Sequence, residues 1–305
     1  MGSGSTPSWP KISPKDLKRD SDNQKDTGIY NSEINTYLQQ LLSDYNTRDA
    51  DAIQTHIDTI MSALSKDDIG IIQLLYGGSI AKHTYVDGLS DIDILAIIDK
   101  TELAGKSPDE VLDYFEDLLR QRLRYTDIRK GKLAITIHFS DGCKTQILPA
   151  LKTATGIKIA DLDAQAWSNV VRPDKFATKL TSVNQQNNNG VVPIIKLFKA
   201  INAEQPKNNQ LKGYHIESLA IEAFSDYNGP KTRMAMLMHF TEYASSAVLS
   251  PIKDSTGQSV HVDDYLGETN SIDRQIISKS LSRLGNQMKI ADSEKSRDRW
   301  QDIIS

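Results

Sequence analysis

Two aspartates separated by one residue, Asp91 and Asp93, stand at the start of an aliphatic run with the β-branched composition of a buried strand. Side chains at i and i+2 of a strand share a face, so both carboxylates point one way while Ile92 and Ile94 point to the other side. Like charges this close repel each other unless water screens them or a cation lies between them. The pair is therefore predicted to bind Mg²⁺, which takes a few carboxylates and completes its shell with water and substrate phosphates.

A glycine pair followed by a serine precedes these aspartates and is suited to holding phosphates. Gly77, Gly78 and Ser79 come directly after the apolar run Ile69–Tyr76, and glycine there lets backbone N–H groups approach a phosphate without a Cβ in the way. Further polar side chains follow within about one helical turn: Lys82, His83 and Thr84. A Gly-Gly turn or an Asp-x-Asp pair alone is common at a solvated strand end. Both together, in this order, predict a phosphate cradle that leads into a metal-binding strand.

Gly78-Ser79 followed by Ser90-Asp91-Ile92-Asp93-Ile94-Leu95 resembles the nucleotidyltransferase motif of the polymerase-β-like superfamily. From about Asn31 to about Gln287 the chain resembles the CD-NTase branch, bacterial relatives of cyclic GMP-AMP synthase and oligoadenylate synthase that make nucleotide second messengers in antiphage defence. The resemblance implies an α+β, two-lobed fold with a mixed catalytic sheet and a mainly helical C-terminal lobe. It also implies that Ser90 lies at the nucleotide.

One position departs from the family pattern. In the superfamily a third carboxylate precedes a proline, in a pattern like Asp-Leu-Val-Pro, and the matching run here is Gln146-Ile147-Leu148-Pro149. The amide oxygen of Gln146 can ligate a metal, but it carries no charge and cannot act as a general base. Either two carboxylates suffice with Gln146 as a weak ligand or hydrogen-bonding group, or another acid such as Asp141 is brought in, or catalysis is lost while nucleotide binding persists. We expect retained activity, because the cradle and both aspartates are intact.

The second half of the chain contains candidate nucleotide-binding residues. Pro193 begins a helix in which Lys196 and Lys199 share one face, a pattern that by itself is typical of a solvated surface. The resemblance implies that a lysine of this helix binds the triphosphate, with Lys199 the best match and Lys196 in support. The run Gly213-Tyr214-His215-Ile216-Glu217-Ser218-Leu219 resembles the family segment near triphosphate and base. Within it Tyr214 either stacks on a base or fills the core, Ser218 is expected at the nucleotide, and His215 is expected to be structural.

Two amphipathic helices are expected ahead of the catalytic strand. Apolar residues recur at helical spacing from Ser32 to Tyr45 and again from Ile53 to Leu64. The run Ser107-Pro108-Asp109-Glu110 predicts another helix start, with Ser as N-cap, Pro in the first turn and Glu three residues after the cap. The resemblance also implies a long helix ahead of the catalytic sheet that can act as a spine joining two lobes.

A β-hairpin is expected beside the strand that carries the aspartates. The strand candidates Lys132–Phe139 and Lys144–Leu148 flank an Asp-Gly turn, and Pro149 is expected to end the second strand. The single cysteine, Cys143, lies in this turn, excludes an intramolecular disulfide and is a poor candidate for a nucleophile. The hairpin is thus expected to present Gln146 to the aspartates.

Composition and charge limit the class of protein. The chain has 305 residues, 38% hydrophobic and 25% charged, without an apolar run long enough to cross a bilayer or a signal peptide, which predicts a cytoplasmic globular protein. Its net charge of −4 argues against an extended nucleic-acid surface. We expect a flexible arm over residues 1–30, a catalytic lobe with an N-terminal spine helix over 31–185 and a helical nucleotide-binding lobe over 190–305.

The resulting functional prediction is a nucleotidyltransferase that joins nucleoside triphosphates with two Mg²⁺ ions, for which Mn²⁺ can substitute. By resemblance the product is a cyclic oligonucleotide that activates a downstream effector, and a regulatory protein partner is compatible with the sequence. One alternative is an enzyme that makes linear oligonucleotides. The other is a nucleotide-binding regulator made catalytically silent by Gln146.

Overall fold

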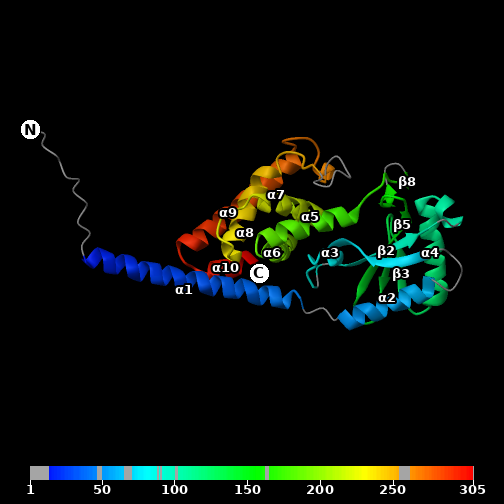
Figure 1. Ribbon diagram of the computed structural model, residues 1–305, viewed down its shortest axis with the longest axis horizontal. Helices are drawn as coiled ribbons and strands as arrows, with labels where there is room; N and C mark the ends of the chain where they lie inside the picture. Colours follow the sequence, from blue (N-terminus) through cyan, green and yellow to red (C-terminus); the bar gives the residue numbers. More distant parts are fainter. Residues whose placement is uncertain are drawn as a thin grey trace, which may run out of the picture.

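The computed structural model describes residues 14–46, 50–64, 71–87, 89, 91–99, 102–161, 165–253 and 262–304, and the fold is mixed α+β (Figure 1). The described α-helices are α1 (Pro14–Asp44), α2 (Ala50–Leu64), α3 (Gly78–Ala81), α4 (Pro108–Arg122), α5 (Pro173–Gln186), α6 (Val191–Glu204), α7 (Gly213–Ser225), α8 (Arg233–Ala247), α9 (Ile272–Ser293) and α10 (Arg297–Ile304). The strands are β1 (Ile71–Tyr76), β2 (Ile92–Ile98), β3 (Asp127–Lys130), β4 (Ile135–His138), β5 (Lys144–Lys152), β6 (Ile157–Lys158), β7 (Ala160–Asp161) and β8 (Ala166–Trp167). Short 3₁₀ turns are η1 (Glu102–Gly105), η2 (Lys207–Asn209) and η3 (Asp264–Leu266).

The main sheet is mixed, as predicted. Its strands are ordered β1-β2-β5-β4-β3, and β6 pairs with β5 near its end. The β2–β5 pair is parallel, whereas β1–β2, β4–β5 and β3–β4 are antiparallel. The predicted hairpin is confirmed as β4–β5, and it lies directly beside β2. The strand with the aspartates therefore sits inside the sheet, with the strand of Gln146 as its neighbour.

The prediction that Pro149 ends its strand is wrong. β5 continues to Lys152, and Pro149 lies opposite Ala96 in the parallel pairing with β2. Proline cannot donate a backbone hydrogen bond, so it suits a strand position without a partner on one side. On the side away from β2, the pairing with β4 stops at Ile147 and that with β6 starts at Leu151. Pro149 occupies this gap, where no N–H is required.

Two helices cover one face of the sheet. Apolar residues of α2, α4 and the strands form one core, which includes Ile60, Phe115, Ile94 and Ile147. The predicted start of α4 is confirmed: Ser107 and Glu110 make reciprocal bonds between side chain and backbone, and Pro108 stands in the first turn. This core packs against one face of β2, and the opposite face of the strand is left for the aspartates.

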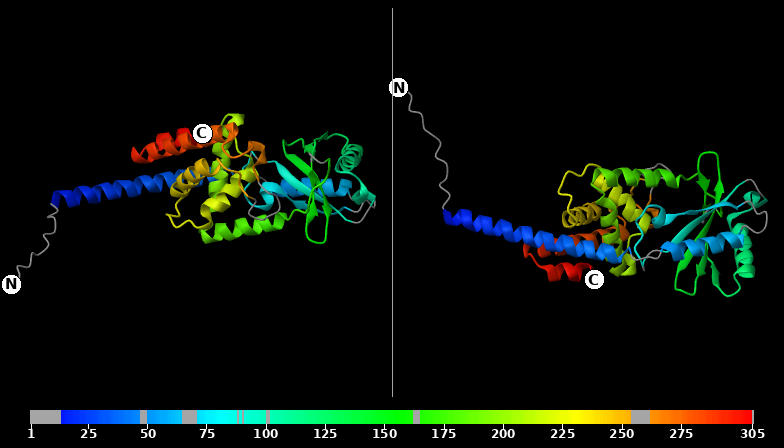
Figure 2. Two further views of the ribbon diagram at one scale, coloured as in Figure 1. Left: turned by 90° about the horizontal axis from the view of Figure 1, so that it is seen from above. Right: turned by 60° about the horizontal axis from the view of Figure 1, so that its bottom comes forward.

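The C-terminal half forms a second, helical core to which α1 also belongs. Tyr30, Ile34, Leu38 and Leu42 of α1 pack with α5 to α10, and the Tyr30 hydroxyl donates to the Ala291 carbonyl at 3.1 Å and accepts from the Trp300 indole N–H at 2.8 Å. Residues 14–30, expected within a flexible arm, lie in the helix α1, which begins at Pro14, and the flexibility and bounds of that arm stay a prediction. Figures 1 and 2 show the N-terminal half of α1 projecting beyond the other helices.

Core membership departs from the predicted lobe bounds. The spine helix was expected with the catalytic lobe, but α1 and also Phe176, Leu180 and Val183 of α5 belong to the helical core. The Asn- and Gln-rich run Asn184–Asn189 has the composition of an exposed loop, yet α5 extends to Gln186 and Asn187 is buried, donating to the Val183 and Phe224 carbonyls. The division of the chain into a lobe over 31–185 and a lobe over 190–305 stays a prediction. Among the described helices, none has the length and apolar character that a membrane crossing requires.

Candidate functional site

The two aspartates lie at the start of β2, on the face away from the α2–α4 core. Ile92 and Ile94 are buried in that core, while Asp93 is half-buried on the opposite face, so the predicted alternation is confirmed. The backbone carbonyl of Asp93 accepts a hydrogen bond from the Gly77 N–H at 2.8 Å. That bond ties the glycine pair to the strand. Because the Gly77 N–H already donates to this carbonyl, any backbone N–H groups that bind a phosphate here come from residues after Gly77.

Gly78 makes the closest approach to Asp93. Its φ is +50°, in the left-handed region that glycine adopts without penalty, and a Cβ at this position would lie 1.8 Å from Asp93 Oδ2. Gly78 and Ser79 begin α3, and the first N–H groups of a helix have no partner within it. The sequence Gly-Ser thus places backbone donors next to a carboxylate, an arrangement suited to a phosphate with its cation.

Asp91 and Gln146 are brought together by the sheet. Gln146 lies opposite Asp93 in the β2–β5 register, and its side-chain amide donates to Asp91 Oδ2 at 2.5 Å. Lys144 Nζ lies 2.9 Å from the same oxygen. Asp141 is not brought in: its carboxylate is bonded to His56 at 2.7 Å and to the Cys143 N–H at 2.9 Å. The explanation in which Asp141 replaces the third carboxylate is therefore not supported.

The environment of the carboxylates suits a cation. Burial, and next the negative charge of Asp91, raise the pKa of Asp93, while Lys82 and Lys199 oppose that rise. A divalent cation between the two aspartates would remove the repulsion that Asp93 now carries. Within the described residues no group of three His, Cys, Asp or Glu side chains is arranged for a metal, and Asp91 and Asp93 are the carboxylates that would hold a cation here. They fit Mg²⁺, which takes one or two carboxylates and fills its shell with water and phosphate oxygens.

Glu217 of α7 joins the candidate phosphate-binding lysines of both lobes. Its carboxylate is 1% exposed and forms ion pairs with Lys82, from the segment after α3, and with Lys199 of α6 at 2.8 Å. The Thr84 hydroxyl also donates to it, and Lys199 contacts the Thr84 carbonyl at 3.1 Å. Burial acts to raise the pKa of Glu217, but Lys82 and Lys199 outweigh it and hold the pKa below its ordinary value. At Lys199, burial lowers the pKa of the ammonium group and the charge of Glu217 raises it. The effect of burial is larger, so the pKa of Lys199 is below its ordinary value.

An aromatic pair borders this cluster. The rings of Phe176 and Tyr214 lie 4.5 Å apart, and Lys82 Nζ is 5.1 Å and 5.3 Å from their centroids. Tyr214 is 37% exposed, so it borders the core and keeps a face that a base could contact. Ser218 is buried and its hydroxyl donates to the Tyr214 carbonyl at 2.9 Å. The nucleotide-binding roles of both residues stay predictions.

Lys196 does not join Lys199. Its ammonium group bonds to Asn46, in the turn after α1, and lies 4.1 Å from the centroid of Tyr85, beside a cavity of about 320 Å³ between α1, α6 and the start of α8. Burial, and next the charge of Lys199, lower the pKa of Lys196 to about 8. The predicted contact of Lys196 with a triphosphate at the aspartates is therefore not supported by this placement.

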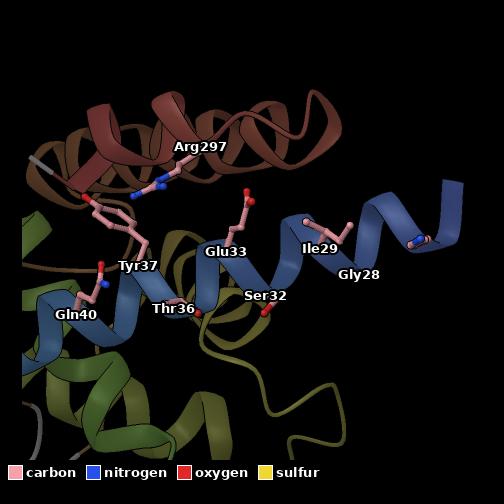
Figure 3. A pocket seen from close by; sticks show the side chains of 9 residues that line it. Gly28, Ile29, Ser32, Glu33, Thr36, Tyr37, Gln40 and Arg297 are labelled. Atoms are coloured by element: carbon pink, nitrogen blue, oxygen red, sulfur yellow. The ribbon is translucent and has the colours of Figure 1, made fainter. Parts of the chain in front are cut away.

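One predicted site residue is not described, and His215 and the pocket between α1 and α10 take no part in the candidate site. Ser90 falls outside the described residues. His215 is buried and structural, as expected, with its Nδ1 2.9 Å from the Tyr265 hydroxyl and burial lowering its pKa to about 4. The pocket of Figure 3 lies between α1 and α10 and is lined by residues such as Glu33, Tyr37 and Arg297. It contains none of the candidate site residues.

Sequence reasoning did not assign a role to Glu217 or Lys144. A glutamate inside the apolar run of α7 was a usable signal, because a buried carboxylate requires a cationic partner. Lys144 could have been found from strand periodicity, because it stands two residues before Gln146 and shares its face. Its contact with Asp91 depends on the parallel register, which the sequence does not reveal.

Comparison with known proteins identifies the family and the fold. Residues 33–184 match the domain family described as Second Messenger Oligonucleotide or Dinucleotide Synthetase (SMODS). The structure of Escherichia coli MS115-1 CdnC with ATP is similar with a TM-score of 0.67 at 16% identity, covering 83% of this chain and 90% of that one. Bradyrhizobium diazoefficiens CdnG with GTP gives 0.66 at 14% identity, covering 84% and 88%. Escherichia coli DncV in its 3'-deoxy GTP bound form gives 0.63 at 10% identity, covering 96% and 90%.

No curated protein sequence matches the chain. At these identities the likeness to solved structures establishes the fold, and the SMODS match establishes the family. The chain belongs to the bacterial CD-NTase family of the polymerase-β-like superfamily and is a nucleotidyltransferase.

Proposed function

We propose that the protein joins nucleoside triphosphates into a cyclic oligonucleotide second messenger, with Mg²⁺ held by Asp91 and Asp93. The observation that supports this proposal is the convergence of three groups: the carboxylates of Asp91, just before β2, and Asp93, on β2; the backbone donors at the start of α3, where Gly78 packs on Asp93; and the Lys82–Glu217–Lys199 cluster, whose charges act on Asp93. Carboxylates, backbone donors and ammonium groups are the components that hold a nucleoside triphosphate and its cation.

In the proposed reaction a ribose hydroxyl attacks an α-phosphorus and pyrophosphate leaves. The metal would lower the pKa of the attacking hydroxyl and offset charge on the departing oxygens. Gly78 and Ser79 would orient the β- and γ-phosphates through backbone N–H groups and the Ser79 hydroxyl. Lys199 and Lys82 would balance the charge of the leaving pyrophosphate. Gln146 supplies no base, and its side-chain amide would orient Asp91 through the hydrogen bond that it donates to that carboxylate.

The test is incubation of the purified protein with the four ribonucleoside triphosphates, and separately with deoxynucleotides, in Mg²⁺ or Mn²⁺. We expect phosphatase-resistant products, identified by mass, that the Asp91→Asn/Asp93→Asn variant does not form. Phosphatase-sensitive ladders would favour linear oligonucleotide synthesis. Nucleotide binding by calorimetry without any product would favour the silent regulator, which is the candidate that the neutral Gln146 supports.

The biological context follows from the family and is part of the same proposal. A cyclic nucleotide made in the cytoplasm would act on a separate effector, in defence against phage. Transfer of the gene with its neighbours into a sensitive bacterium, followed by phage challenge, tests this. Protection that disappears with Asp91→Asn/Asp93→Asn is the expected result, and protection that persists in the variant would contradict it.

A further inference from the structure

Strand β5 places a lysine, Lys144, beside the carboxylate of Asp91. In the parallel β2–β5 register, Gln146 lies opposite Asp93 and Thr145 lies opposite Ile92. Residues alternate between faces of a strand, so Lys144 shares the face of Gln146 and falls opposite Asp91. This position follows from backbone pairing and does not depend on the side-chain conformation.

The contacts agree with that register. Lys144 Nζ lies 2.9 Å from Asp91 Oδ2, and Gln146 donates to the same oxygen at 2.5 Å. The Lys144 side chain is 41% exposed and that of Asp91 is 33% exposed, so this ion pair is in contact with solvent. One oxygen of a proposed metal ligand is thus held by a partly exposed cation and a neutral donor.

The charge of the site follows from these residues. Asp91 and Asp93 together carry two negative charges, and Lys144 cancels one of them. Lys82 and Lys199 share the single charge of Glu217 and add positive potential on the other side. A divalent cation that enters without nucleotide meets little net attraction, and it must displace the ammonium group from Asp91. A triphosphate brings several negative charges and offers Lys144 other oxygens to contact.

We propose that Lys144 is a positioning residue that makes metal loading depend on bound nucleotide. Without nucleotide it holds Asp91 and opposes the cation. With nucleotide, the phosphates contribute ligands and charge, Lys144 leaves Asp91, and the cation binds between the carboxylates and the phosphates. The inference rests on the proposed function, because it requires Asp91 and Asp93 to be the metal ligands.

The experiment measures Mn²⁺ binding by electron paramagnetic resonance on the full-length protein, without nucleotide and with a non-hydrolysable ATP analogue. We compare wild type with Lys144→Met, Lys144→Arg and Lys152→Met. Lys152 lies on the same strand and pairs with Asp99 at 3.4 Å, outside the site, so it is the matched control. Removing a positive charge a few ångströms from a divalent ion in a partly solvated site changes affinity by roughly tenfold.

We expect Lys144→Met to tighten Mn²⁺ binding about tenfold without nucleotide, and the gap from wild type to shrink with the analogue. Lys144→Arg keeps the charge and should resemble wild type, as should Lys152→Met. Mn²⁺ affinity of Lys144→Met within twofold of wild type, without nucleotide, overturns the inference. Circular dichroism confirms that the variants are folded.

A further variant separates the two levels of the proposal. If Asp91→Asn/Asp93→Asn loses Mn²⁺ binding while Lys144→Met behaves as wild type, the proposed metal site stands and only the role of Lys144 fails. If the double variant binds Mn²⁺ as well as wild type does in both conditions, the proposed metal site fails, and the inference fails with it.

Discussion

At the scale of single residues, Glu217 does the most to organise the site. It is almost fully buried, and its charge is balanced by two lysines that come from different parts of the chain, one from the segment after α3 and one from α6. A carboxylate in such surroundings is stable only while both cations remain nearby. Glu217 therefore fixes where Lys82 and Lys199 stand before any phosphate arrives.

Glu217→Gln should lower the free energy of unfolding by about 3 kcal/mol near pH 7, because it leaves two buried ammonium groups without a counter-charge. The pKa of Glu217 is below its ordinary value, so its stabilising charge is present above about pH 4.3 and is lost as the pH falls through the folded-state pKa. Urea unfolding at neutral and acid pH should show the gap narrowing in acid.

Glu222→Gln, on the same helix, is the control for this prediction. Burial raises the pKa of Glu222, so its charge is disfavoured in the folded protein and the neutral variant should lose little stability. An equal loss in both variants would show that the Glu217 pairs contribute nothing specific.

At the scale of elements, the junction of β1, α3 and β2 positions the site. The Gly77 N–H is bonded to the backbone of β2, and Gly78 leaves room for the Asp93 carboxylate. The junction of α3 with β2 therefore depends on the absence of a side chain at Gly78. A larger residue there would move either the start of α3 or the carboxylate.

Gly78→Ala should reduce nucleotidyl transfer by at least about a hundredfold, because a shift of about 1 Å in positioning costs that much. The fold should persist, as the change lies outside both hydrophobic cores. Product formation and circular dichroism provide the two measurements. Gly105→Ala is the matched control, since a Cβ there meets nothing within 4 Å. Full activity of Gly78→Ala would contradict the close packing of Gly78 on Asp93.

The sequence predicts the local features of these elements better than it predicts which distant elements they contact. The alternation around Asp91 and Asp93, the cap at Ser107 and the β4–β5 hairpin were all predictable, because each depends on neighbours in the chain. Lys196 and Lys199 share a helix, but their partners differ: Lys196 bonds to Asn46, in the turn after α1, and Lys199 pairs with Glu217 of α7. Pro149 continues a strand because β4 stops short of it, which also depends on pairing.

At the scale of the whole molecule, two hydrophobic cores meet across a small set of polar contacts. One core underlies the sheet and the other fills the helical half together with α1. The Lys82–Glu217 ion pair joins the segment that follows α3 to α7 of the helical half. Coupling between the two halves therefore depends on charges that a bound triphosphate would also engage.

Lys82→Met should loosen the coupling of the two halves, because it removes an ion pair that joins them. Differential scanning calorimetry should then show a calorimetric enthalpy larger than the van't Hoff enthalpy, the sign of separate unfolding units. Lys231→Met is the control, since Lys231 contacts Asn187 and Tyr227 within the helical half alone. A single two-state transition for Lys82→Met, equal in shape to wild type, would contradict this prediction.

The pairing of Lys144 and Gln146 with the aspartates also has a genetic consequence. Lysine and glutamine codons each differ from a glutamate codon in the first base alone. One base substitution at either position would therefore place a new carboxylate beside Asp91 and change how readily the protein takes up a cation. With Mg²⁺ held by Asp91 and Asp93, as proposed, a point mutation at either position would change the magnesium concentration that the protein requires.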